Sequence, residues 1–336
     1  MINYRHLFFV VFLFFYGCVE TLISVTIIPD GRYHVKIESQ GDERDIKDKD
    51  FNLPSSSNWS VEEFQKQDID SDETIFVRSA ESLLSGRNFL GDNGQLGSLR
   101  YPISVEKKKG IFSDTYTLIQ IFEGRNIDKK YPMLSKSLLN PGNNKLENRV
   151  QTEIIMYCLR RSMEDVSTDQ NVEALLQERI LNHFNGVFFK AEEEDKLFDL
   201  LNEGDEEKVE FLNLPEKLVR TNFKPFVDLL PRNFIDNCIN RMRDYLHEAN
   251  VTIQLNDDTF KFVGTLPGVV FSSNADSISS DSLWWIFDLK DFMNESFTIE
   301  AASVVYYPQK IQQTIVLGAL VILIVIFFIA KRKAKS

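Results

Sequence analysis

Cysteine is scarce in this sequence. The 336 residues include three cysteines, Cys18, Cys158 and Cys238, which is too few for a small domain held together by disulfides. Cys18 falls in an N-terminal targeting region, which leaves Cys158 and Cys238 for one disulfide bridge outside the cytoplasm. Both also lie on the apolar faces of predicted helices, so a pair of buried free thiols is the alternative.

Positive charge and histidine are also in short supply. The sequence has 38 Lys and Arg against 50 Asp and Glu, a net charge of −12, and four His. A nucleic-acid-binding protein needs a basic face, so no nucleic-acid partner is expected. The sequence contains no nucleophile–base pair, metal-ligand spacing or phosphate-binding loop. We therefore expect no cofactor, no metal and no catalytic residues; a hydrolase whose site forms only in three dimensions is the alternative.

One long apolar run lies near the C-terminus. Residues Thr314–Ala330 carry no charge, and together with Ile311 the run is long enough for a helix to cross a hydrocarbon core of about 30 Å. Lys331, Arg332 and Lys333 follow at once, and basic residues mark the cytoplasmic side. We expect a transmembrane helix over 311–330 and a basic cytoplasmic tail over 331–336, with the bulk of the chain on the extracytoplasmic side.

A shorter apolar run, Leu7–Tyr16, follows Arg5 near the N-terminus. This pattern is typical of a secretory signal peptide and is too short for an ordinary spanning helix, so residues 1–17 are predicted to be a signal peptide. The residues Phe15-Tyr16-Gly17-Cys18 resemble the lipobox of bacterial lipoproteins. Cys18 is therefore a candidate for lipidation.

Between these two ends the hydrophobic period changes twice. Runs of β-branched residues around Pro29-Asp30-Gly31, and again around Lys107–Gly110, predict two β-hairpins. From about residue 145 to 250 the apolar residues recur at helical spacing, which predicts a small helical bundle. Strand character returns at Val251–Leu255 and continues to Tyr307.

Two short helices are expected inside the first strand-rich region. Ser60 and Glu63 have the spacing of a capping box, which predicts a helix beginning there. Residues Ser79–Arg87 are also expected to form a brief helix.

The second strand-rich region carries a series of short motifs. They are Leu266-Pro267-Gly268, the turn Ser273-Asn274, a Trp284-Trp285 strand that ends in Asp288-Leu289, and a last strand before the apolar helix. With the signal, Cys18 and a strand entering Pro29-Asp30-Gly31, this order resembles the membrane-anchored bacterial envelope lipoproteins of the LppM type, interrupted by a helical insertion. The resemblance implies a compact, β-rich fold on the outer face of a membrane and brings no catalytic residues.

The expected fold class is α+β. A β-rich, membrane-proximal domain is formed by residues 18–130 and 251–308, with an inserted helical bundle over 131–250 and one C-terminal transmembrane helix. Tyr306 and Tyr307 end the last strand close to the bilayer, and tyrosine is a residue type of membrane interfaces. With a lipid on Cys18, both ends of the β domain are expected to meet the same membrane surface.

The function indicated by these features is that of a single-pass envelope protein. We interpret the extracytoplasmic part as a non-enzymatic module that binds a lipid, a peptide or a protein partner close to the membrane. A eukaryotic type I membrane glycoprotein is a further alternative, since glycosylation sequons begin at Asn58, Asn250 and Asn294.

Lipidation of Cys18 is testable by metabolic labelling with a radioactive fatty acid. We expect label on the wild-type protein and none on a Cys18→Ser variant, because the thiol is the acceptor. Absence of label on the wild type would exclude the lipoprotein interpretation of this cysteine.

Overall fold

The computed structural model describes residues 19–43, 46, 51–67, 74–91, 94, 97–139, 144–194, 216–279 and 281–333. The predicted signal peptide, Cys18 and residues 334–336 lie outside the described residues. So do the side chains of Lys331, Arg332 and Lys333, although the helix that contains these residues is described.

The described chain alternates between strands and helices in three blocks. The strands are β1 (Glu20–Ile27), β2 (Arg32–Gly41), β3 (Ser60–Gln67), β4 (Thr74–Asn88), β5 (Ile103–Lys109), β6 (Ser113–Phe122), β7 (Thr259–Thr265), β8 (Val269–Ser273), β9 (Ser277–Ser279), β10 (Ser282–Asp288) and β11 (Phe297–Tyr306). The helices are α3 (Ile127–Lys130), α4 (Pro132–Leu139), α5 (Asn144–Gln170), α6 (Ala174–Glu193), α8 (Glu216–Phe223), α9 (Phe234–Gln254) and α10 (Pro308–Lys333), with 3-10 turns η1 (Lys224–Leu229) and η2 (Leu289–Asp291).

The strands form one curled sheet built from both sides of the helical block. The strand order is β8-β11-β6-β5-β4-β2-β1-β7-β10-β9, and β3 pairs with β4 beside this path. The parallel pairing of β1 with β7 joins the two halves of the sequence. The edge strands β8 and β9 are linked by only Asn274–Asp276, so the two ends of the sheet have to approach each other, and the sheet curls into a half-barrel.

The concave side of this sheet holds the core. Along β1, β2, β6, β7 and β10 every second residue is buried, as the two-residue period of a strand requires. Rings from distant segments meet there with centroids 4.6–6.2 Å apart. These rings belong to Phe51, Tyr101, Phe122, Phe260, Phe287 and Phe292. Trp285 is fully buried nearby and donates from Nε1 to Oδ1 of Asn274, 2.9 Å away.

The predicted fold class is confirmed, as are most of the elements. Both predicted hairpins form, β1–β2 around Pro29-Asp30-Gly31 and β5–β6 around Gly110. The periodic helical stretch forms α5, α6, α8 and α9, and the strands predicted after residue 258 form β7, β8, β10 and β11; the structure adds the short strand β9. The helical block runs from Ile127 to Gln254.

Three local predictions are wrong, and in each case long-range contacts override the local pattern. The expected helices at Ser60 and at Ser79–Arg87 are instead β3 and β4, which pair along eight residues from Ser60↔Glu81 to Gln67↔Thr74. The expected strand at Val251–Leu255 is the last turn of α9. In this turn the Thr252 hydroxyl donates to the Glu248 carbonyl, 2.8 Å away, and accepts from Arg125.

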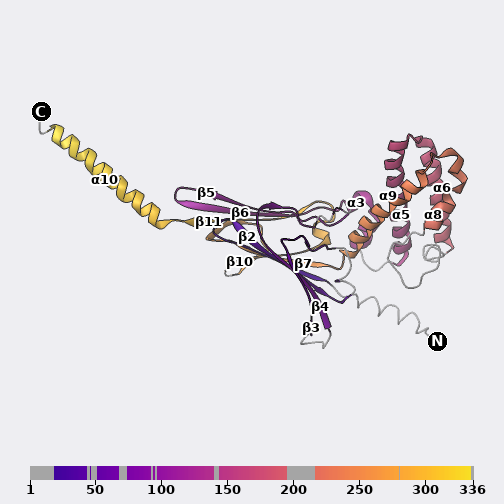
Figure 1. The fold of residues 1–336 in the computed structure, drawn as a ribbon, viewed down its shortest axis with the longest axis horizontal. Coiled ribbons are helices and arrows are strands. Elements are labelled where there is room, and N and C mark those ends of the chain that lie inside the picture. Colours follow the sequence, from indigo (N-terminus) through magenta and orange to yellow (C-terminus); the bar gives the residue numbers. More distant parts are fainter. Residues whose placement is uncertain are drawn as a thin grey trace.

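The helices and α10 lie at opposite ends of the sheet (Figure 1). Helices α5, α6, α8 and α9 pack together beyond one end, and α10 extends away from the other. Within the described residues one helix is long and apolar enough to cross a membrane, over Pro308–Phe327. Its apolar side chains are exposed from Ile315 to Phe327, as a spanning helix in lipid requires.

The direction of β1 corrects the expectation that both ends of the β domain meet one membrane surface. The turn after β1 lies beside the β5–β6 hairpin near α10, because Lys107 and Tyr116 both donate to the Pro29 carbonyl. Glu20, the first of the eight residues of β1, therefore lies at the far end of the sheet, beside Thr259.

Candidate functional site

Two clusters of polar side chains connect the sheet with the helices. The first lies at the end of the sheet where α10 begins. Only Tyr307 separates the last strand, β11, from α10. Its backbone N–H donates to the Phe112 carbonyl at 2.8 Å, and its hydroxyl lies near the Asp114 carboxylate, where the two groups shift each other's pKa. The junction between sheet and helix is therefore held by both the backbone and the side chain of one residue.

Asp114 is the centre of this site. It is buried at the start of β6, and its Oδ2 lies 2.9 Å from Nζ of Lys107 on the neighbouring strand β5. The hydrogen bond from Tyr307 and the ion pair with Lys107 together lower the pKa of Asp114, and the same contacts raise the pKa of Tyr307 and of Lys107. The carboxylate is therefore charged at neutral pH. It contacts Lys107 of the β5–β6 hairpin and lies near Tyr307, the residue before α10.

The same site reaches the first hairpin of the chain. Lys107 Nζ donates to the Pro29 carbonyl at 2.5 Å, and the Tyr116 hydroxyl donates to it at 2.7 Å. Lys310, in the first turn of α10, places Nζ 4.3 Å from the centre of the Tyr307 ring, a cation–π contact. The α10 junction thus holds β1–β2, β5–β6, β11 and α10 together.

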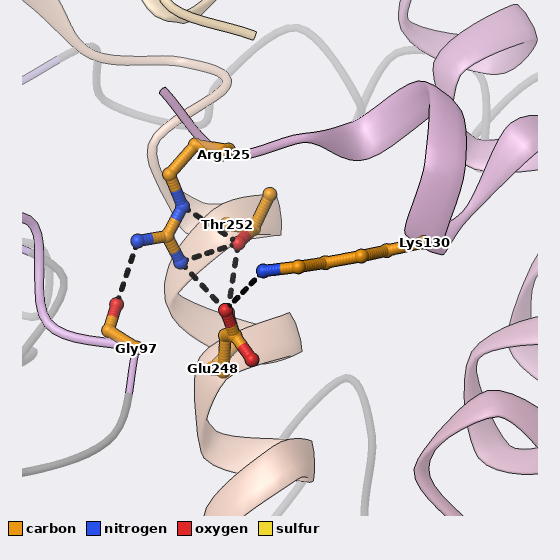
Figure 2. Close-up of polar contacts among 5 residues, drawn as sticks. All are labelled: Gly97, Arg125, Lys130, Glu248 and Thr252. Carbon is orange, nitrogen blue, oxygen red and sulfur yellow. Dashed lines mark hydrogen bonds and ion pairs between the residues drawn. The ribbon is translucent and has the colours of Figure 1, made fainter. Parts of the chain in front are cut away.

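The second polar site lies at the opposite end, where the helices join the sheet. Figure 2 shows its centre, the guanidinium of Arg125 on the segment between β6 and α3. Arg125 donates to the Gly97 carbonyl at 2.8 Å, to the Glu248 carbonyl at 3.1 Å and to the Thr252 hydroxyl at 2.6 Å. Three segments far apart in sequence are therefore connected by one buried side chain.

Glu248 and Lys130 complete this cluster. The Glu248 carboxylate lies 2.5 Å from Nζ of Lys130, just after the Arg125 segment. Burial lowers the pKa of Arg125, and the nearby Glu248 charge opposes that shift; an arginine remains protonated in proteins in any case. Gly97 is needed for this close approach, since a Cβ there would lie 2.3 Å from the Glu248 Cα and its φ is +87°.

Strand β11 connects the two polar sites. Just before it, the Asn294 side chain bonds to both the backbone N–H and the carboxylate of Asp128, and Ser296 Oγ accepts from the Gly124 N–H at 3.1 Å. The ten residues of β11 then run to Tyr306, a length of about 34 Å at strand rise. One uninterrupted strand therefore leads from the helical end of the sheet to α10.

The residues singled out from the sequence occupy different parts of the structure. Tyr306 is 59% exposed and Tyr307 belongs to the α10 junction. Cys158 and Cys238 are free and buried, so the structure has the two-thiol alternative and no bridge between them. Burial raises the pKa of both thiols, that of Cys238 to about 12, which makes both unreactive in the folded protein.

Sequence reasoning did not find Asp114, Lys107, Arg125 or Glu248. The one available signal was a charged residue at an inward position of a strand, since Asp114 shares its face with the buried Tyr116. Arg125 and Glu248 could not be identified from local sequence patterns, because these two residues contact each other but lie 123 residues apart in the chain. In the described part of the chain no group of three or more His, Cys, Asp or Glu residues is arranged to hold a metal ion.

Arg125 should be necessary for the stability of the join between helices and sheet. We expect Arg125→Ala to lower the free energy of unfolding by about 2–4 kcal/mol, because it leaves the Gly97 and Glu248 carbonyls and the Thr252 hydroxyl without their buried donor. Arg241→Ala is the matched control, since Arg241 is exposed and its ion pair with Asp244 is long, at 3.9 Å; it should cost less than about 1 kcal/mol. Denaturant unfolding of the full chain in detergent measures both, and equal losses would contradict the role of Arg125.

Comparison with known proteins adds a likeness in fold. No family model matches the sequence, and no curated protein matches it. Among solved structures, the NMR structure of the folded domain of Mycobacterium tuberculosis LppM resembles this chain with 10% sequence identity and a TM-score of 0.30, over 88% of this chain and 96% of that chain. LppM is also the type of lipoprotein that the sequence motifs resemble.

Proposed function

We propose that this protein is a single-pass membrane protein whose extracytoplasmic part is a non-enzymatic interaction module in a fixed position above the bilayer. The observation that carries this proposal is the α10 junction. A helix that anchors a domain through a flexible linker leaves the domain free to turn, but here a single residue joins β11 to α10. Its backbone is hydrogen-bonded to Phe112, and its ring contacts Lys310 in the first turn of α10.

The orientation follows from the basic residues after the apolar segment. Lys331, Arg332 and Lys333 succeed the span directly, and such residues remain on the cytoplasmic side. The sheet and the helical block are then extracytoplasmic.

A protein or peptide partner fits the geometry better than a bilayer lipid. The helical block lies at the end of the sheet opposite α10 (Figure 1), and β11 alone separates the two ends by about 34 Å. A partner that contacts these helices therefore approaches from the side away from the membrane. The helices expose large apolar side chains that such a partner would cover, among them Leu175, Phe189, Val227 and Leu229.

The orientation is tested by labelling intact cells with a membrane-impermeant maleimide. Glu62→Cys places a thiol on the exposed strand β3, and Ala334→Cys places one in the basic tail. We expect labelling of Glu62→Cys in intact cells and of Ala334→Cys only after permeabilisation. The wild type is the background control, because Cys158 and Cys238 are buried; the reverse pattern would exclude the proposed topology.

The interaction is tested by photocrosslinking from the helical block in native membranes. A photoreactive amino acid at Leu175 or Phe189, both exposed on α6, should give an adduct of defined mass. The same residue at Thr26, exposed on β1, is the control. A long Gly/Ser insertion after Pro308 should abolish the adduct if the fixed position matters.

Two results would contradict the proposal. Without an adduct from either helical position, the helical block is not the interacting surface. An adduct that persists in the insertion variant would show that binding does not require a fixed position above the bilayer.

A further inference from the structure

The tip of the β5–β6 hairpin exposes apolar side chains at an unusual place. Ile111 is 77% exposed, the highest value among the large hydrophobic residues of the described chain, and its neighbour Phe112 is 38% exposed. Single exposed hydrophobic residues are common on protein surfaces and need no explanation. The position of these two relative to α10 distinguishes them from the others.

The tip lies beside the start of α10. The Phe112 carbonyl accepts the hydrogen bond from the Tyr307 N–H, and Ser113 pairs with Tyr306. The candidate span begins at Pro308, the next residue of the chain. The headgroup layer of a bilayer is about 5–8 Å thick on each side. If α10 spans the bilayer, Ile111 and Phe112 therefore lie at headgroup depth.

Charge at the tip complements this location. Lys107 is turned inward to Asp114 and Pro29, but Lys108 and Lys109 are exposed. Two exposed lysines next to exposed apolar residues are a local exception in a protein with a net charge of −12. Anionic phospholipid headgroups attract lysines near a membrane surface, and the apolar side chains enter the layer beneath.

The tip is already ordered for such a contact. The Gly110 N–H donates to the Ser113 carbonyl at 2.8 Å, and a Cβ at Gly110 would lie 2.6 Å from that oxygen. The bonds from Lys107 and Tyr116 to Pro29 hold the hairpin stem. Binding would therefore require little loss of conformational freedom.

Neighbouring side chains extend the same surface. Tyr306 is 59% exposed and Val269 is 63% exposed. Val269 pairs with Val304, two residues before Tyr306, so both side chains lie on the outer face of the sheet near α10.

We propose that residues Lys108–Phe112 form a second membrane contact, in which Ile111 and Phe112 enter the interface and Lys108 and Lys109 bind anionic phospholipid headgroups. This inference rests on the proposed function, because it requires α10 to span the bilayer. The α10 helix and the hairpin tip would then fix the tilt of the sheet by two separate contacts with the membrane.

The test uses the full chain reconstituted into vesicles of phosphatidylcholine with phosphatidylglycerol. Ile111→Cys carries an environment-sensitive fluorophore, and a quencher is attached to the lipids at shallow depth. Phe89→Cys is the matched control, because Phe89 is also strongly exposed, at 69%. Phe89 comes just after Asn88, which pairs with Ile103 at the end of β5 away from the hairpin tip. We expect quenching at position 111 to exceed that at position 89 by about threefold or more; equal quenching would overturn the proposal.

The lysines are tested separately on the same labelled protein. Reversing both charges with Lys108→Glu and Lys109→Glu should reduce quenching at position 111 in vesicles with phosphatidylglycerol and leave it unchanged in pure phosphatidylcholine. No change in either vesicle would overturn the headgroup part of the proposal. Flotation of the protein with the vesicles is measured in parallel, since failure to float contradicts the membrane anchor itself, whereas flotation without quenching contradicts only the second contact.

Discussion

The Tyr307–Asp114–Lys107 contacts are the constraint on which the arrangement of this protein depends. A strand and a helix that meet at a single residue have a defined angle only if that residue is held by its surroundings. The Tyr307 backbone is held by the Phe112 carbonyl, its ring contacts Lys310 and its hydroxyl lies near the Asp114 carboxylate, which pairs with Lys107. Because Lys107 also reaches Pro29, the two hairpins that flank the concave core are attached to the same point as α10.

The Arg125 cluster performs the corresponding task at the other end. A helical block inserted between two halves of a sheet contacts the sheet through few segments, and polar contacts with directional hydrogen bonds define its position better than apolar packing alone. Arg125 joins Gly97 and the last turns of α9, while Asn294 joins α3 to the segment before β11. The helical block is therefore connected to α10 through one continuous strand, β11.

The strand order of the sheet also determines where the first residue of β1 lies. Since β1 pairs in parallel with β7 and its last residues lie near the α10 junction, its first residue has to lie at the far end. The molecule therefore has one end beside α10, where Ile111, Phe112 and Tyr306 are exposed, and another formed by the helical block and the start of β1.

Local pattern in the sequence determined the two hairpins, the periodic helices, the strands after residue 258 and the apolar segment of α10, because each depends on residues close together in the chain. It did not determine β3 and β4, which become strands only because they pair with each other and with β2, or the last turn of α9, which Arg125 helps to hold. Local sequence pattern also could not predict the two polar sites. Asp114 and Tyr307, like Arg125 and Glu248, lie more than a hundred residues apart in the chain. Only long-range contacts bring each pair together: β6 pairs with β11 beside Asp114 and Tyr307, and Arg125, just after β6, donates to α9.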